Sequence, residues 1–128
     1  MIYRNMLKSK IHRAHITQAC LDYEGSITIA PELLKSANIL PNEAVHVWNI
    51  TSGTRFETYA IPGISGSNDI CVNGAAAHLV SVGDLIIIAT FSQIPEEQCS
   101  TWIPTVIFVN ENNQLKEVRQ EKLGCIEV

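Results

Sequence analysis

A glycine followed by a hydroxyl residue, Gly25-Ser26, stands between two apolar stretches that favour strands. Glycine can adopt backbone conformations that side chains forbid, and its missing side chain leaves its carbonyl open to attack. The Ser26 hydroxyl lies next to that carbonyl, so a strained turn would let it attack and convert the amide to an ester. Elimination from the ester, followed by hydrolysis of the dehydroalanine, would turn Ser26 into a pyruvoyl group.

The same dipeptide is also typical of an ordinary turn. Gly66-Ser67 is a second copy in this chain, and the dipeptide alone does not separate self-processing from a simple turn. The neighbouring residues must therefore decide between the two interpretations.

Other residues able to bind charge or transfer protons fall on predicted strands and at their ends, where functional sites usually gather. Arg55 and Tyr59 lie four apart on a predicted strand and hence on one face, whereas Thr58 points to the other face. Arg55 and Lys10 also have an ordinary interpretation as surface charges, and Tyr59 as a core residue with a solvated hydroxyl. The small residues of the 73–76 segment (Asn73, Gly74, Ala75 and Ala76) would let backbone N–H groups approach a ligand closely.

The composition bounds the class of protein. A chain of 128 residues is predicted to form a single domain spanning 1–128. Charged residues make up only 17% and hydrophobic ones 46%, which favours burial of surface in an oligomer. A net charge of -4 argues against nucleic acid as a partner.

Compartment and metal content can also be predicted. No apolar run reaches the roughly 18 residues of a membrane span, and basic residues near the start precede no apolar signal segment. The cysteines are too widely spread for a metal-binding pair, which predicts free thiols in the cytoplasm: Cys20, Cys71, Cys99 and Cys125. On a strand, His12 and His15 would point to opposite faces, so no metal site is expected.

The patterning predicts many short strands and one substantial helix. Pro31 suits the first turn of a helix over 30–40, which Pro41 would stop. Alternating residues around a turn at 51–54 predict a hairpin. The other predicted elements are one or two strands within 1–21, strands at 27–29, 70–72 and 84–91, a helical turn at 75–79, and a last hairpin over 104–118. This pattern indicates a mainly β protein, a compact barrel with one or two short helices.

Several stretches then match one known family, in family order, from near the N-terminus to Pro104. The chain resembles the pyruvoyl-dependent aspartate 1-decarboxylases. The matching stretches are Met6-Leu7-x-x-Lys10-x-His12-Arg13, Tyr23-Glu24-Gly25-Ser26, Asn42-Glu43-Ala44, Trp48-Asn49, Arg55-Phe56-x-Thr58-Tyr59-Ala60-Ile61, Val72-Asn73-Gly74-Ala75-Ala76-Ala77-His78, Ser81-Val82-Gly83-Asp84 and Thr101-Trp102-x-Pro104.

The resemblance implies a fold, an assembly and an activity. The fold would be a six-stranded double-psi β-barrel, assembled as a homotetramer with active sites between neighbouring subunits. The chain would be a proenzyme that cleaves itself between Gly25 and Ser26 into a short β chain and a longer α chain, which begins with pyruvoyl made from Ser26. The enzyme would convert L-aspartate to β-alanine and CO2 for pantothenate biosynthesis, without pyridoxal phosphate or metal. Some family members need an accessory maturation protein.

The resemblance also implies residue roles. Thr58 would help the acyl shift and contact substrate, and Tyr59 would donate the proton that quenches the carbanion left by decarboxylation. Lys10 and Arg55 would hold substrate carboxylate, for which arginine offers bidentate contact. Asn73 would lie beside the bond between substrate and the pyruvoyl group. Backbone groups of the remaining small residues would bind the rest of the substrate: Gly74, Ala75 and Ala76.

Two alternatives stay open at this point. The barrel could be a non-catalytic binding module whose Gly25-Ser26 bond never cleaves, although such a module would have no need for this combination of residues. The same chemistry could also act on another acidic amino acid such as glutamate, since one methylene changes specificity by only about 1–3 kcal/mol.

Overall fold

The computed structural model describes residues 1–124, so Cys125 lies outside the described residues. The chain is mainly β, as predicted. Its strands are β1 (Tyr3–His15), β2 (Gln18–Cys20), β3 (Ser26–Ile29), β4 (Ala44–Asn49), β5 (Arg55–Pro62), β6 (Ile70–Asn73), β7 (Leu85–Pro95), β8 (Thr105–Val109) and β9 (Leu115–Val118). The helices are short: α1 (Pro31–Ala37), the 3-10 helix η1 (Gly74–Leu79) and α2 (Glu96–Cys99).

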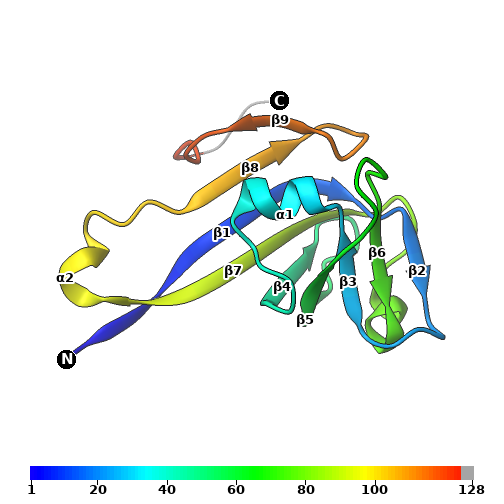
Figure 1. Cartoon of the computed structure of the whole chain (residues 1–128), viewed down its shortest axis with the longest axis horizontal. Helices are drawn as coiled ribbons and strands as arrows, with labels where there is room; N and C mark the ends of the chain where they lie inside the picture. Colours follow the sequence, from blue (N-terminus) through cyan, green and yellow to red (C-terminus); the bar gives the residue numbers. More distant parts are fainter. Residues whose placement is uncertain (125–128) are drawn as a thin grey trace.

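The strands within residues 1–124 form one mixed sheet in the order β2-β6-β3-β5-β4-β7-β1-β8-β9 (Figure 1). Three neighbouring pairs are parallel, β1–β8, β2–β6 and β3–β5, and the others are antiparallel. Nine strands in one sheet confirm a mainly β fold. The finer expectation, six strands in a double-psi barrel, stays a prediction.

The longest pairing joins β1 to β7. Their antiparallel register runs from Tyr3 opposite Pro95 to His15 opposite Leu85, with a bulge between Ile11 and Ala14. β7 also pairs with β4 on its other side, so the most apolar predicted strand is indeed central. Both predicted hairpins, β4–β5 and β8–β9, are confirmed.

The helix α1 is shorter than the sequence predicts. It begins at Pro31 but ends at Ala37 rather than near Leu40, because Asn38 adopts the left-handed conformation (φ 58°, ψ 47°). The Asn38 N–H caps the helix by donating to the carbonyls of Leu34 and Lys35, which is a common way for helices to end. The prediction that this helix runs to residue 40 and is stopped by Pro41 was therefore wrong.

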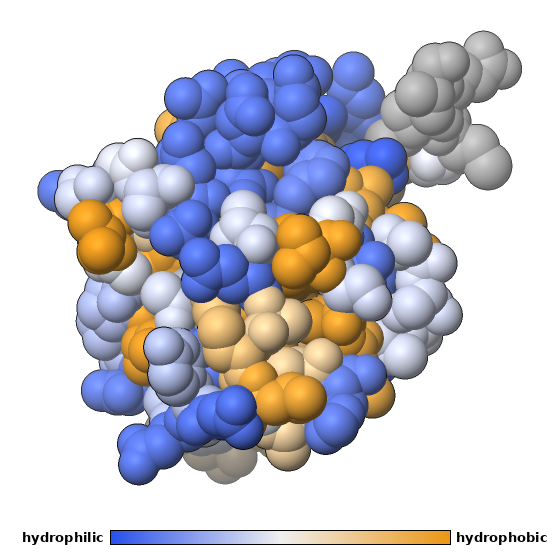
Figure 2. Space-filling view, turned by 90° about the vertical axis from the view of Figure 1, so that its right-hand side faces the viewer, coloured by the Kyte–Doolittle hydropathy of each residue, from blue (hydrophilic) through white to orange (hydrophobic). Residues whose placement is uncertain are grey.

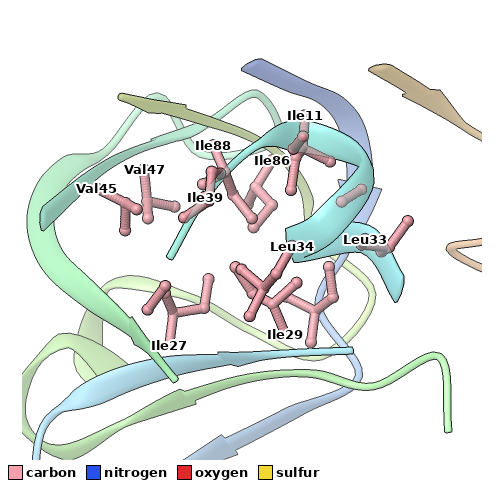
Figure 3. Packing of buried hydrophobic residues seen from close by; sticks show 14 of the residues in the cluster. Ile11, Ile27, Ile29, Leu33, Leu34, Ile39, Val45, Val47, Ile86 and Ile88 are labelled. Atoms are coloured by element: carbon pink, nitrogen blue, oxygen red, sulfur yellow. The ribbon is translucent and has the colours of Figure 1, made fainter. Parts of the chain in front are cut away.

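One hydrophobic core lies under these elements. Figure 3 shows Ile29 beside Leu34 of α1 and Ile27 farther to the left, with residues of β1, β4 and β7 above them. The cluster includes Ile11, which precedes the Gly25-Ser26 bond, as well as residues that follow it. The two sides of that bond therefore share one core, and β3 is anchored by apolar contacts immediately after Ser26.

His12 gives the fold a pH dependence. Its ring packs edge-on against Phe108, with 5.3 Å between centroids, and its Nδ1 atom is buried without a hydrogen-bond partner in the described part of the chain. Burial lowers the pKa of His12, and the positive charges of Lys10 and Arg13 lower it further. The unfolded chain takes up this proton at the ordinary pKa of about 6.5, so the free energy of unfolding falls as pH drops below that value.

We therefore expect the thermal midpoint to fall between about pH 7.5 and about pH 5.5. His12→Gln, which cannot take up the proton, should reduce that fall, whereas His78→Gln at an exposed histidine should not. Differential scanning calorimetry of the three proteins measures this. An equal fall in all three would remove His12 from this role.

Among residues 1–124, no helix is long and apolar enough to cross a membrane.

Candidate active site

Ser26 is the first residue of β3 and is almost fully buried, with 2% of its surface exposed. Its φ is +146°, a value that residues with side chains seldom adopt. A strained backbone of this kind typically costs about 1–3 kcal/mol and persists only where the surroundings impose it. This torsion is about the N–Cα bond of Ser26, directly next to the Gly25–Ser26 peptide bond that the sequence predicts to be cleaved.

The neighbouring strand β6 places an amide against the Ser26 hydroxyl. Ser26 lies opposite Asn73 in the antiparallel β3–β6 register. The Asn73 Nδ2 donates to Ser26 Oγ at 3.0 Å and to Thr28 Oγ1 at 3.1 Å. Asn73 is itself 5% exposed, so these bonds are largely shielded from water. The Asn73 amide therefore holds Ser26 Oγ in place from the neighbouring strand β6.

The orientation of the Asn73 amide is set from its other end. The Cys71 thiol, two residues earlier on β6, donates to Asn73 Oδ1 at 3.2 Å. With its oxygen engaged by a donor, the amide must turn its N–H groups toward Ser26 and Thr28. Burial raises the pKa of the Cys71 thiol to about 11, with the nearby Cys20 thiol and Asp69 carboxylate adding to the rise, so Cys71 keeps its hydrogen at neutral pH.

Gly74 holds the loop before Ser26. Its φ is +74°, and an added Cβ would lie 2.9 Å from Gly25 Cα, 3.0 Å from Gly25 N and 3.1 Å from the Tyr23 carbonyl oxygen. All three are backbone atoms that cannot move aside cheaply. Only glycine therefore lets the start of η1 approach the candidate cleavage point this closely.

Replacing Gly74 by alanine should push the 23–25 backbone away from Ser26 and slow cleavage. Gly66→Ala is the matched control, because Gly66 has a similar φ of +78° but an added Cβ there would meet nothing within 4 Å. Both variants pay about 1–2 kcal/mol for a left-handed non-glycine residue. Only Gly74→Ala adds the steric clash, about 1–3 kcal/mol more. Urea unfolding and the fraction of cleaved chain measure the difference, and equal behaviour of the two variants would refute the packing role.

A cavity of about 600 Å³ opens beside these residues. Four of the predicted site residues line it, namely Gly25, Ser26, Tyr59 and Asn73. Tyr59 reaches it from β5 and is 41% exposed. The rest of the lining is polar and apolar in mixture: Gln18, Tyr23, Glu24, Thr28, Asn42, Ile61, Gly63, Ile64, Asp69 and Cys71.

The other predicted site residues do not line this cavity. Thr58 is half-buried on the opposite face of β5 from Tyr59, as alternation requires. Arg55 is exposed at the far end of β5, with its guanidinium carbon 5.3 Å from the Trp48 ring centroid. Lys10 on β1 pairs with Glu121 at 3.2 Å. Ala75 and Ala76 belong to η1, behind Gly74.

Two residues of the site were missed by sequence reasoning. Thr28 shares the Asn73 amide with Ser26, and Cys71 orients that amide. Spacing offered a signal for Thr28, because residues two apart on a strand share a face. No local pattern identifies Cys71, since its importance depends on the pairing of β3 with β6.

This arrangement has several of the parts that peptide rearrangement requires. It combines a buried hydroxyl, a strained backbone at the residue after a glycine, an amide donor on the nucleophile and a cavity large enough for a small substrate. The profile of the family described as aspartate decarboxylase matches residues 2–116. The chain belongs to this family.

Individual relatives agree. An aspartate 1-decarboxylase of Legionella pneumophila (strain Lens) is 73% identical over 124 residues, covering 97% of this chain and 93% of that protein. One from Myxococcus xanthus is 58% identical over 112 residues, 88% of this chain and 86% of its own. One from Rhodopirellula baltica is 55% identical over 122 residues, 95% of this chain and 78% of its own.

Proposed function

We propose that this protein is a carboxy-lyase that converts L-aspartate to β-alanine and CO2, made as a proenzyme that cleaves itself between Gly25 and Ser26. The family and its similar relatives support the decarboxylation of aspartate. The single structural observation that carries the proposal is Ser26 itself, buried at φ +146° directly after Gly25 with the Asn73 amide on its hydroxyl.

Cleavage begins with the Ser26 hydroxyl. Its oxygen attacks the Gly25 carbonyl carbon, and the amide becomes an ester. Asn73 donates to that oxygen. The C–N bond between Gly25 and Ser26 breaks, and the hydroxyl hydrogen passes to the departing Ser26 nitrogen, which becomes a free amine. The strain at Ser26 is released when the peptide nitrogen leaves. Thr58, on the other face of β5, assists this acyl shift, which is the role that the family resemblance implies for it.

The residues around Ser26 fit a pyruvoyl group derived from it. The group has no hydroxyl, and Asn73 Nδ2 still has Thr28 Oγ1 as an acceptor after Ser26 Oγ is lost. The cavity opens directly on this position. When formed, the pyruvoyl group supplies a ketone that takes up the electrons released as the α-carboxylate leaves.

Tyr59 is the proton donor in this proposal. It lies in the cavity with Ser26, and its neutral phenol carries an O–H group that can donate a proton to carbon. Positioned acids of this kind typically contribute 10²- to 10⁴-fold to a rate, about the effect we assign to Tyr59.

Lys10 and Arg55 bind substrate carboxylate across a subunit boundary. Both lie outside the cavity of their own protomer, so a homotetramer with sites between neighbours would bring them in from another copy. Exposed apolar side chains support association, including Ile64 (78%), Tyr23 (67%) and Leu21 (52%). Figure 2 views the molecule from the right-hand side of Figure 1 and shows hydrophobic residues gathered at the centre of that face.

The remaining parts of the proposal follow from the family. The chain is one domain, a double-psi barrel, and cleavage leaves its core shared by both fragments. We place it in the cytoplasm, in the synthesis of pantothenate, and an accessory protein promotes cleavage if the purified chain stays uncut.

Substrate trapping tests the proposed reaction. Cyanoborohydride added with radiolabelled aspartate should fix label on the fragment that begins at residue 26, and only after cleavage. Labelled glutamate should attach and turn over far less. Label on uncut chain, or preferred turnover of glutamate, would contradict the proposed cofactor or the proposed substrate respectively.

A further inference from the structure

Two cysteines lie next to the hydrogen-bond network of Ser26. Cys20 on β2 and Cys71 on β6 have their sulfur atoms 3.8 Å apart. The two strands are parallel neighbours, with Gln18 opposite Cys71 and Cys20 opposite Asn73, and Figure 1 shows them side by side. The two thiols therefore form a diagonal pair on one face of the sheet, the face on which Asn73 meets Ser26.

The pair is connected to the nucleophile by an unbroken series of contacts. The Cys71 thiol donates to Asn73 Oδ1 at 3.2 Å, and Asn73 Nδ2 donates to Ser26 Oγ at 3.0 Å. Cys20 has a second connection, because β2 ends at Cys20 and the chain runs directly from there through 21–25 to the cleavage point. A change at the two sulfurs would therefore reach both the serine oxygen and the glycine before it.

The two cysteines differ in access. Cys20 is half-buried, whereas Cys71 is 6% exposed. A reagent in solution therefore reaches Cys20 more readily than Cys71.

We propose that Cys20 and Cys71 are a redox modification site, at which a small-molecule disulfide converts the two thiols to an intramolecular disulfide and thereby slows self-cleavage at Gly25-Ser26. This inference rests on the proposed function, because it concerns the maturation of the same site.

The chemistry balances as two thiol–disulfide exchanges. The Cys20 thiolate attacks one sulfur of the small disulfide, forms a mixed disulfide and releases one small thiol. The Cys71 sulfur then attacks the Cys20 sulfur, and its proton passes to the departing second small thiolate, which leaves as a thiol. The protein loses two protons and two electrons, and the small disulfide gains them to become two thiols.

The disulfide alters the site in two ways. The sulfur atoms must close from 3.8 Å to about 2 Å, which draws the end of β2, and with it the 21–25 segment, toward β6. Cys71 also loses its S–H, so Asn73 Oδ1 loses its donor and the amide is no longer held with its N–H groups on Ser26. Loss of one buried hydrogen bond alone corresponds to as much as about a tenfold change in rate.

Cell-free synthesis of the full chain under reducing conditions gives the precursor needed for the test. Half is treated with oxidised glutathione and half with dithiothreitol, and cleavage is followed by denaturing gel. The Cys20–Cys71 bond is scored separately, by intact mass and by protection from alkylation. We expect the wild-type disulfide form to cleave at least about fivefold more slowly, with the rate restored by dithiothreitol.

Variants identify the sulfur atoms responsible. Cys20→Ser should cleave like reduced wild type and be insensitive to glutathione disulfide, whereas Cys99→Ser should remain sensitive. Cys71→Ser keeps a hydroxyl donor for Asn73 and should cleave faster than Cys71→Ala, in which the donor is absent. A merely structural role of Cys71 would not produce this rescue.

Three outcomes would overturn the inference: no Cys20–Cys71 bond under oxidation, a bond with unchanged cleavage, or equal sensitivity of Cys20→Ser. A reduced wild-type chain that stays uncut even after incubation with cell extract would instead contradict the proposed function. Disulfide formation is scored independently of cleavage, so the two failures are distinguishable.

Discussion

Replacing Ser26 by alanine is expected to leave one uncut chain that decarboxylates no aspartate. The variant has no oxygen to attack the Gly25 carbonyl and no precursor of a pyruvoyl group. The fold should survive, because Asn73 Nδ2 keeps Thr28 Oγ1 as an acceptor and β3 stays anchored by its apolar contacts. The cost in stability should be about 1 kcal/mol, that of one hydrogen bond.

Ser67→Ala is the matched control for this variant. Ser67 follows Gly66 and is the second Gly-Ser pair of the chain, but Ser67 itself has no positive φ and does not line the cavity. Its alanine variant should cleave and turn over normally. Denaturing gels and release of CO2 from labelled aspartate measure both proteins, and cleavage of the Ser26 variant at residue 25 would contradict the assignment of the nucleophile.

Tyr59→Phe should separate maturation from turnover. Tyr59 lies in the cavity but makes no hydrogen bond to Ser26 or Asn73, so cleavage should proceed as in the wild type. The rate of decarboxylation should fall about 10²- to 10⁴-fold, because the carbanion then lacks its positioned acid. The loss should appear in kcat rather than KM, since the phenol acts after substrate has bound.

Tyr3→Phe is the control for loss of a tyrosine hydroxyl outside the cavity. Tyr3 is half-exposed at the start of β1, and its variant should match the wild type in both cleavage and turnover. Steady-state kinetics of fully cleaved proteins provide the comparison. Normal kcat in Tyr59→Phe would remove Tyr59 from its role as proton donor.

Local patterns predicted the elements whose structure is decided locally. The β4–β5 hairpin follows from alternation on both sides of the 51–54 turn, and β7 from its apolar run. The end of α1 was missed because it depends on one residue, Asn38, adopting a left-handed conformation. The helix α2 has four residues, too few for a helical period to appear in sequence.

The site likewise has residues that the sequence predicts and residues that depend on how the strands pair. Gly25-Ser26 was visible in the sequence as a glycine carbonyl beside a hydroxyl. Tyr59 and Asn73, which share its cavity, were singled out on or next to predicted strands, and the resemblance gave them roles. What sequence could not predict is the pairing of β3 with β6, which brings residues 47 positions apart into hydrogen-bond contact. That pairing alone gives Cys71 its place in the network.

Lys10 and Arg55 do not line the cavity within a single protomer. Family resemblance gives both the same task, yet Lys10 pairs with Glu121 and Arg55 lies over Trp48, each outside the cavity. Alternation correctly placed Arg55 and Tyr59 on one face of β5, but sharing a face of a strand does not bring two side chains to one site. The homotetramer we propose would supply the missing proximity.

A denaturing intact-mass spectrum of the purified protein tests the central claim most directly. The account predicts two fragments, residues 1–25 and residues 26–128, with the larger carrying a pyruvoyl group in place of its N-terminal serine. A single uncut mass that persists after incubation with cell extract would contradict it, because the strained backbone at Ser26 would then have no part in making a cofactor.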